Sequence, residues 1–470
     1  MNAYSCRLFP SIVIFFLMSS CNNSPQPARA TLAGPAARKP VRLVTLDPGH
    51  FHAALVQKTM YDDVDSNVYV YAPAGPDVKD HLARISAYNT REKDPTRWNE
   101  HVYTGPDYLQ QMIHDKKGNT VVLAGNNREK TSYILQSLGE GFNVLADKPM
   151  VIDGKAFGAL TRAFDTAAAR HLILYDIMTE RYEITSILQR ELASMPAVYG
   201  VQEKGDPAHP GVIASSVHRW YKYVSGKALI RPAWSFDVTQ QGEGIVDVMT
   251  HVVDLVQWGC FPDQALDYKT DVVVNHARHW TTDLSLSQFR TVTGMTDFPG
   301  YLKKYRSPLS DTVLRIYANG QIDYHLKGIC VRTTVTWTYD APAGAGDTYS
   351  SVMRGTKANL VIRQDAAEHY QPTLYIEPMD AGPGYEQILD AQFAILQAKY
   401  PGISLSKQGS RWVVIIPGHY TEGHEAHFAR VTEKFLGFLK DHNMPSWEVP
   451  NMLAKYYTTT RALDLARQGH

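Results

Sequence analysis

The chain lacks an excess of charge of one sign, and this excludes several classes of partner. Its 470 residues include 47 basic and 47 acidic side chains, so the formal net charge is zero. Nucleic acids and anionic membrane surfaces attract proteins through a strong positive field, and we expect neither as a partner. Small uncharged ligands fit this charge balance better.

Cysteine is also scarce. Of the four cysteines, Cys6 and Cys21 lie in an expected export signal, which leaves Cys260 and Cys330. Two distant cysteines provide neither a disulfide framework nor the spacing of a zinc site. They could pair in an oxidising periplasm or remain two buried thiols, and the sequence leaves both possibilities open.

The apolar run near the N-terminus, Ile12–Met18, is much shorter than the ~20 residues that cross a bilayer. It follows Arg7 and has the length of a signal-peptide core. Small residues then precede Cys21, as in a bacterial lipobox whose cysteine is acylated. We therefore expect a lipoprotein signal over 1–21 and a flexible tether over 22–40. The protein would be exported and lipid-anchored facing the periplasm; a plain secretory signal is the alternative.

Short apolar runs alternate with helical stretches between residues 41 and 176. Strands are predicted at Val41–Leu46, Val68–Tyr71, Thr120–Ala124, Phe142–Ala146 and His171–Tyr175, and helices at Ala53–Met60, Glu129–Leu138 and Gly154–Ala169. This alternation is typical of βαβ units around a parallel sheet. The sequence predicts a Rossmann domain over 41–176.

Residues 177–470 have a different character, which predicts a second α+β domain with a largely antiparallel open sheet. Helices are expected over 179–192 and in the tail, at Glu425–Leu439 and Val449–Ala466, and strands at Val313–Tyr317 and Val331–Tyr339. Asn319-Gly320 between strands predicts a two-residue hairpin, because both central turn residues need positive φ.

The turn after the first strand, Asp47 to His52, stands where a dinucleotide-binding sheet places its phosphate loop. Gly49 occupies the position of the central glycine of a GxGxxG pattern, whereas Asp47 and His52 replace the outer glycines. The expected cofactor-binding residues of this turn are Gly49, His50, Phe51 and His52. No acidic residue follows the second strand at Tyr71, so the choice between NAD and NADP stays open.

His50 and His52 also allow a metal-dependent hydrolase, because two histidines two residues apart at a strand end can ligate a metal, as in amidohydrolases. We expect instead that His52 packs against the first helix and that His50 lines the cofactor cleft, with no metal. His424 and His427 resemble a zinc motif, but position 428 is Phe428, so the HExxH pattern is incomplete.

Three polar residues are candidates for catalysis. Lys148 follows the fourth expected strand, at the sheet edge where ligands of such folds bind. Asp247 and His251 are four residues apart and would share a helix face. The aspartate could orient the imidazole, which would accept a hydroxyl proton, while Lys148 polarises the oxygen.

From Val41 to about Ala466, the chain resembles the glucose–fructose oxidoreductase/inositol dehydrogenase/rhizopine-catabolism (Gfo/Idh/MocA) family. The resemblance is carried by 119–150, which ends in Asp-Lys-Pro-Met where the family has Glu-Lys-Pro, by Gly242–Asp254, and by Gly355–Leu360. It implies an oxidoreductase with NAD or NADP that oxidises or reduces a hydroxyl or keto group of a sugar or glycoside.

The resemblance also implies residue roles. Lys148 and His251 would be the catalytic pair with Asp247 in support, and Asn126 and Asn127 would lie near the nicotinamide. The expected substrate contacts are Arg181, Tyr182, His218, Arg219, Trp220 and Tyr221.

Export limits the supply of free dinucleotide, so the cofactor should be retained. Three alternatives remain open: a redox-neutral glycosidase or lyase working through a 3-keto intermediate, the metal-dependent hydrolase, and a sugar-binding protein without activity. An exposed open sheet face would favour a homodimer or higher oligomer.

Overall fold

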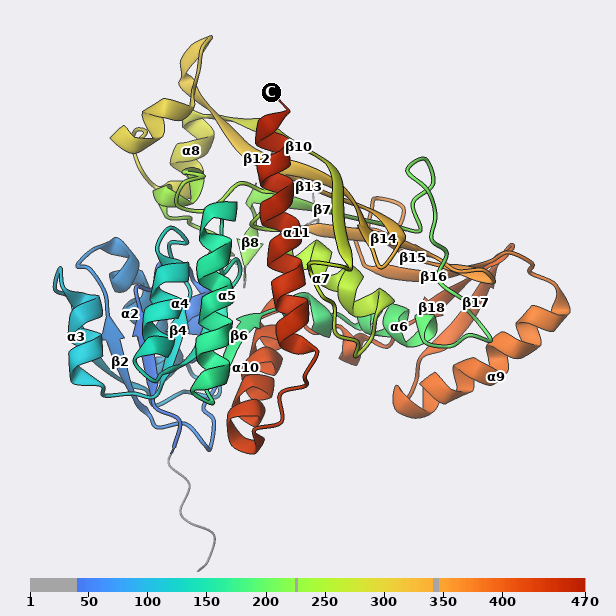
Figure 1. Ribbon diagram of the computed structural model, residues 1–470, viewed down its shortest axis with the longest axis horizontal. Coiled ribbons are helices and arrows are strands. Elements are labelled where there is room, and N and C mark those ends of the chain that lie inside the picture. The colour runs from blue at the N-terminus through green and yellow to red at the C-terminus, as the bar shows by residue number, and fades with distance from the viewer. Residues whose placement is uncertain (1–39, 225–226, 341–345, 470) are drawn as a thin grey trace, which may run out of the picture. The chain divides into compact units, whose positions relative to one another are not determined.

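A parallel sheet of six strands is built from residues 43–177, the part of the chain that we call the first half (Figure 1). The computed structural model describes residues 40–224, 227–340 and 346–469. The strand order is β3-β2-β1-β4-β5-β6, which is the order of dinucleotide-binding sheets. The strands are β1 (Leu43–Leu46), β2 (Asn67–Tyr71), β3 (Asn99–Tyr103), β4 (Thr120–Leu123), β5 (Asn143–Asp147) and β6 (Leu174–Ile177). The predicted Rossmann architecture is therefore confirmed.

Helices separate these strands: α1 (His52–Leu55), α2 (Pro76–Thr90), α3 (Tyr108–Asp115), α4 (Lys130–Gly139) and α5 (Gly154–Ala169). α5 agrees with its prediction, and its N-cap Asp153 accepts a hydrogen bond from the Ala156 amide. α1 is shorter than predicted, because its helix ends at Leu55 and turns follow. β3 was not predicted; its side chains are mostly exposed and polar, as an edge strand allows.

The second half forms a sheet of ten strands, in the order β10-β12-β13-β7-β14-β15-β16-β18-β17, with β11 paired to β12. Its strands are β7 (Val212–Tyr221), β10 (Val272–Ser285), β11 (Arg306–Ser307), β12 (Ser310–Leu326), β13 (Ile329–Asp340), β14 (Thr348–Arg354), β15 (Ala358–Arg363), β16 (Thr373–Pro378), β17 (Ser404–Gln408) and β18 (Arg411–Ile415); β8 (Tyr223–Val224) and β9 (Lys227–Ala228) form a separate pair. β13 and β7 are parallel and the other pairs are antiparallel, which confirms the predicted sheet type.

The hairpin predicted at Asn319-Gly320 is wrong. β12 runs straight through both residues, and Gly320 pairs with His279 on one side and Val335 on the other. A Cβ on Gly320 would collide with Ile245, so glycine here permits close packing rather than a turn. The tight turn lies at Lys327 and Gly328, whose φ values of 48° and 81° place both in the left-handed region.

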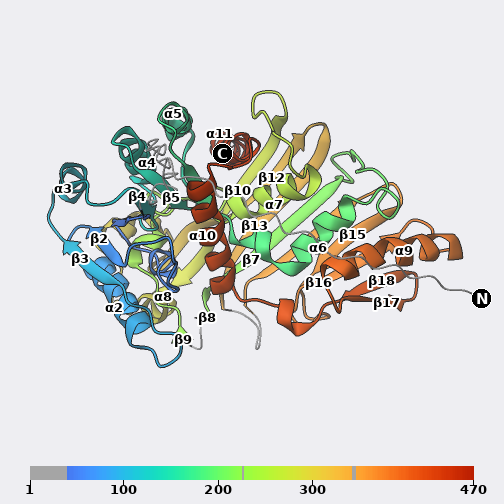
Figure 2. The same ribbon diagram turned by 90° about the horizontal axis from the view of Figure 1, so that it is seen from below.

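Helices cover one face of the second sheet (Figure 2). α6 (Ile184–Ala193), α7 (Met249–Cys260), α9 (Pro383–Lys399) and α11 (Glu448–Gln468) contribute to one apolar core with its strands. The other helical elements are η1 (Thr179–Tyr182), η2 (Ala233–Phe236), α8 (Leu286–Thr293), η3 (Gly300–Tyr305), η4 (Gly418–Tyr420) and α10 (His424–Asp441). α10 packs with the first sheet, since Phe428 and Phe435 belong to its core.

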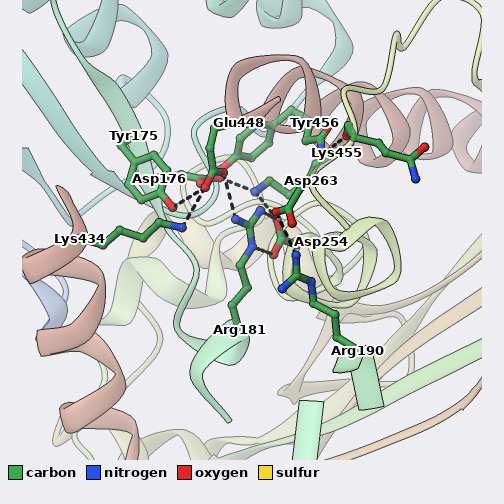
Figure 3. A network of polar contacts seen from close by, with 12 residues as sticks. Tyr175, Asp176, Arg181, Arg190, Asp254, Asp263, Lys434, Glu448, Lys455 and Tyr456 are labelled. Carbon is green, nitrogen blue, oxygen red and sulfur yellow. Dashed lines mark hydrogen bonds and ion pairs between the residues drawn. The ribbon is translucent and has the colours of Figure 1, made fainter. Parts of the chain in front are cut away.

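A buried network of charges joins the two halves through α11 (Figure 3). Lys455 of α11 pairs with Asp176 of β6 at 2.6 Å and with Asp254 of α7 at 2.8 Å. Arg181 of η1 bonds Asp254 through two nitrogens and reaches Glu448 of α11 at 3.0 Å. Burial alone would raise the pKa of Asp254, but the charges of Arg181 and Lys455 lower it below its usual range.

Residues from Pro40 onward form one compact unit that contains both sheets. The expected signal over 1–21, the lipidation site Cys21 and nearly all of the tether lie outside the described residues. Among the helices of the described residues, none is long and apolar enough to cross a membrane. Cys260 and Cys330 both carry free thiols, so they do not pair with each other.

Candidate functional site

A cavity of about 350 Å³ lies between the carboxyl edge of the parallel sheet and the second sheet. The turn after β1 and the residue after β5 form one wall, the start of α7 forms another, and β7, β13 and β14 form the floor. The polar and aromatic residues that line it include His50, Phe51, His52, Lys148, Glu180, His218, Lys222, Arg231, Asp247, His251, Trp337, Asp347 and His424. Most of the predicted catalytic and turn residues thus share one cavity.

Lys148 is held in the cavity wall by Asp247. Its Nζ lies 2.7 Å from Asp247 Oδ1, and the second carboxylate oxygen accepts a hydrogen bond from Gln241 at 2.9 Å. The predicted role of Asp247 is therefore corrected: this carboxylate fixes the lysine rather than the imidazole. The reason is that α7 begins only at Met249, so Asp247 lies in the turn before it and does not share a helix face with His251.

His251 presents an imidazole that is kept neutral. Burial lowers its pKa well below the usual value, and the charge of Lys148 lowers it further. Within the described part of the chain its Nδ1 is buried and has no hydrogen-bond partner. The ring lines the cavity, and a neutral imidazole can accept a proton from a hydroxyl group.

The turn after β1 brings two histidines against the end of β5. His52 Nδ1 lies 2.9 Å from Asp147 Oδ2, and His50 Nδ1 lies 3.5 Å from the same oxygen. Burial is the largest cause that lowers the pKa of both histidines. The ring of His424 from α10 stacks on His52 with centroids 4.9 Å apart.

The floor of the cavity comes from the second sheet. Side chains alternate along β7, so Ser216 and His218 face the cavity. His218 Nδ1 lies 3.0 Å from Asp347 Oδ2, and Lys222 Nζ lies 2.5 Å from the same oxygen. Trp337 stacks beside His218 with ring centroids 5.1 Å apart. This floor combines an aromatic ring with several hydrogen-bonding groups.

Other predicted substrate residues do not line this cavity. Trp220 lines a smaller neighbouring cavity. Arg219 donates a hydrogen bond to the Thr338 hydroxyl, and the ring of Tyr221 stacks on that of Tyr339. Arg181 is 6% exposed within the network of Figure 3, because Asp254 and Glu448 neutralise it there. Tyr182 packs against the core of the first sheet. The expectation that these side chains contact the substrate is corrected accordingly.

Asn126 and Asn127 bind protein groups. Asn126 Nδ2 donates to Gln240 Oε1 at 2.6 Å, and Asn127 Nδ2 donates to the Gln241 carbonyl at 2.7 Å. Both partners belong to residues 233–241, which we call the strap. The strap comprises η2 and the turn that follows it, and it crosses from the second half of the chain to the carboxyl ends of the parallel strands.

The strap also covers Gly49. A Cβ on Gly49 would lie 3.1 Å from the ring of Trp234 and 3.1 Å from Asp77 Oδ2. Trp234 Nε1 donates to that same oxygen at 2.8 Å. Asp47 lies nearby, and burial raises its pKa to about 6. Protein groups therefore fill the space directly over Gly49.

Several cavity residues were not predicted from the sequence. Lys222, Asp347 and Glu180 follow no motif, and burial together with neighbouring carboxylates raises the pKa of Glu180 to about 7. The alternation of side chains along β7 could have predicted that His218 faces the cavity and that Arg219 does not. Asp347 lies at the start of another strand, and only the pairing of β14 with β7 brings it there.

Comparison with known proteins identifies relatives over nearly the whole chain. Residues 188–467 match the family described as "Putative oxidoreductase C terminal domain". A crystal structure from Parabacteroides merdae, described as a "putative oxidoreductase", is 52% identical with a TM-score of 0.90, covering 92% of this chain and 99% of its own. Among proteins with a curated description, none matches the sequence.

Two more distant structures share the fold. Levoglucosan dehydrogenase in complex with NADH and levoglucosan is 11% identical, with a TM-score of 0.57 over 91% of this chain and 97% of its own. A 3-ketoreductase from Actinomadura kijaniata, solved with NADP and TDP-benzene, is 13% identical, with a TM-score of 0.53 over 92% and 98%.

Proposed function

Because the chain belongs to the Gfo/Idh/MocA family of oxidoreductases, we propose that it transfers hydride between a nicotinamide dinucleotide and a hydroxyl or keto group of a sugar or glycoside. The observation that carries this proposal is the convergence of Lys148 and His251 on one cavity at the carboxyl edge of the parallel sheet. The NADH and levoglucosan bound to one relative in fold, and the NADP bound to another, support it.

The nicotinamide half of the cofactor fits the residues present. The carboxyl edge of this sheet order is the usual dinucleotide position. Phe51 and Lys148 line the cavity where the ring would lie, next to His251. The pyrophosphate would have to pass over Gly49, which Trp234 and Asp77 cover. We infer that binding displaces the strap from Gly49.

The protein groups act on the sugar as an acid and a base. The bound dinucleotide supplies the hydride acceptor or donor. His251 accepts the hydroxyl proton during oxidation, since its imidazole lines the cavity and is neutral. Lys148 keeps its place through Asp247, and an ammonium group has three donors, so it can also bind the reacting oxygen.

The floor of the cavity suits a carbohydrate. Trp337 offers an apolar ring face, and His218, Asp347 and Lys222 offer donors and acceptors beside it. Sugar-binding sites need both properties, because one face of a pyranose is apolar while its rim carries hydroxyl groups. The mixture of positive and negative groups favours an uncharged sugar over a strongly anionic one.

The test replaces Lys148 by Met in the full chain. We expect turnover of the glycoside substrate to fall by about 10²–10⁴, because the group that binds the reacting oxygen is lost. The dinucleotide released on denaturation, identified by mass, should be unchanged. Lys155→Met is the matched control, since Lys155 is exposed on α5 and should retain full turnover.

Activity of Lys148→Met equal to that of the wild type would reject this function. Release of free monosaccharide without a net change in nicotinamide absorbance would instead support the redox-neutral glycosidase. Assaying both products in one experiment separates the two reactions.

A further inference from the structure

His50, His52 and Asp147 form a cluster beside Lys148 that the proposed redox reaction does not use. One ligand atom from each of the three residues lies within 4.8 Å of the other two. His50 and His52 follow β1, and Asp147 ends β5, so two parts of the parallel sheet edge, separated by β4, build the cluster. The side chains of His52 and Asp147 are 9% and 6% exposed, and His50 opens to the cavity at 27%.

The cluster has unused ligand atoms. Among the described residues, His50 Nδ1 and Asp147 Oδ1 are buried without any hydrogen-bond partner. Buried polar atoms are nearly always paired, so two unpaired atoms within one cluster call for an occupant. An imidazole nitrogen and a carboxylate oxygen are both donor atoms that bind divalent metal ions.

The separations suit a small metal ion. Metal–nitrogen and metal–oxygen bonds of about 2.0–2.2 Å place neighbouring ligand atoms about 3–3.6 Å apart. The two histidine nitrogens lie 2.9 and 3.5 Å from Asp147 Oδ2. Small rotations of the imidazole rings would bring the remaining separations into range, and the metal would replace the proton that now joins His52 to Asp147.

Polar groups beside the cluster already have partners. Asp247 pairs with Lys148 at 2.7 Å. Lys130 donates to the backbone carbonyl of Asp147 at 2.9 Å. The ring of His424 stacks on His52.

We propose that His50, His52 and Asp147 bind one divalent first-row transition metal ion, of the zinc or iron(II) class, with its open coordination positions facing the cavity. Two histidines and one carboxylate are the donor set of several catalytic zinc and non-haem iron sites. The open positions would take water or two neighbouring oxygen atoms of a substrate. This site does not depend on the proposed hydride transfer.

The experiment uses the full chain, stripped with EDTA and titrated with Zn²⁺ by calorimetry. We expect one ion per chain. Mutation of groups outside the ligand shell typically weakens metal binding 10–100-fold, so His50→Ala and Asp147→Asn should each weaken it at least ~100-fold. His419→Ala is the control, because His419 is exposed and lies outside the cluster, and it should bind as the wild type does.

Two further measurements keep the test decisive. Circular dichroism melting of each stripped variant shows whether it is folded, and Co²⁺ loaded in place of zinc should give visible absorption bands that Asp147→Asn changes. Absence of saturable binding, or equal affinity in His50→Ala, Asp147→Asn and the wild type, would overturn the proposal. Dinucleotide content is not part of any readout, so failure of the redox function would not affect the result.

Discussion

Lys148 and His251 lie in one cavity, the lysine as a cation and the imidazole neutral, and their neighbours explain the difference. Asp247 sits 2.7 Å from Lys148 and stabilises the ammonium group. Burial and the charge of Lys148 both disfavour a second cation at His251. In the proposed reaction, Lys148 would therefore bind the developing oxyanion and His251 would accept the proton.

The neutral state of His251 predicts an unusual pH profile. A free histidine loses its base form as the pH falls through about 6.5. Because the pKa of His251 is lowered, its base form persists below that pH, so kcat/KM for oxidation should stay level from about pH 7.5 to 6 and fall only in more acidic buffer. Rate measurements on the wild type and His251→Asn check this. The prediction would be contradicted if kcat/KM of the wild type fell by half near pH 6.5 and this pH dependence were absent from His251→Asn.

Individual site residues differed in how well the sequence revealed them. Lys148 could be predicted because a strand end fixes its position, whereas His251 was predicted from the family segment at 242–254 and from a helical spacing to Asp247 that the structure does not show. Asp147 as the partner of His52, and Arg181 as a buried ion-pair residue, depend on contacts 95 and 73 residues apart in the chain. No local pattern encodes such contacts.

In the proposed function, the strap must leave Gly49 before a dinucleotide can bind. It is held to the first half by Asn126, by the Asn127 side chain and by Trp234, whose indole donates to Asp77 at 2.8 Å. A protein whose binding-competent state is only partly populated shows a correspondingly weaker apparent affinity. Weakening the strap should therefore strengthen dinucleotide binding.

Trp234→Ala tests this expectation. Loss of one hydrogen bond and of the ring over Gly49 lowers the free energy that holds the strap in place by about 1 kcal/mol. This corresponds to about fivefold to tenfold tighter binding of NADH or NADPH. Titration followed by nicotinamide fluorescence measures the affinity. The control is Trp258→Ala. Trp258 lies on α7 under the guanidinium group of Arg190 of α6, and its loss should leave the dinucleotide affinity unchanged. Weaker binding in Trp234→Ala would show that the indole holds the cofactor instead of blocking it.

At the level of elements, burial on both faces made the central parallel strands easy to predict, because they read as continuous apolar runs. Asn319-Gly320 misled the prediction because a hairpin signal and a close-packing glycine look alike in sequence. Asn319 bridges a register shift instead, with its side chain donating to the Trp280 carbonyl and accepting from the Trp337 amide.

The whole molecule depends on charges that only the assembled fold neutralises. Lys455 is fully buried between Asp176 of the first sheet and Asp254 of the second half. Removing one partner of a buried ion pair leaves the other charge uncompensated. The two halves should accordingly unfold together, in one transition.

Lys455→Met should lower the free energy of unfolding by about 3–5 kcal/mol, because buried Asp176 loses its cation and Asp254 keeps only Arg181. Lys399→Met is the matched control; its ion pair with Glu191 is 57% exposed on the lysine side and should contribute less than about 1 kcal/mol. Urea denaturation followed by circular dichroism and by tryptophan fluorescence measures both. Separate transitions for the two probes, or equal effects of the two substitutions, would refute this description.

The position of α11 in the chain has a consequence for biosynthesis. Glu448 and Lys455 leave the ribosome after the residues that they neutralise: Asp176, Arg181, Asp254 and Lys434. Until this helix emerges, a growing chain holds acidic and basic groups that cannot be buried without large cost. The two sheets can therefore close on each other only when synthesis has passed α11, and a nascent chain stalled before it should remain sensitive to proteases throughout.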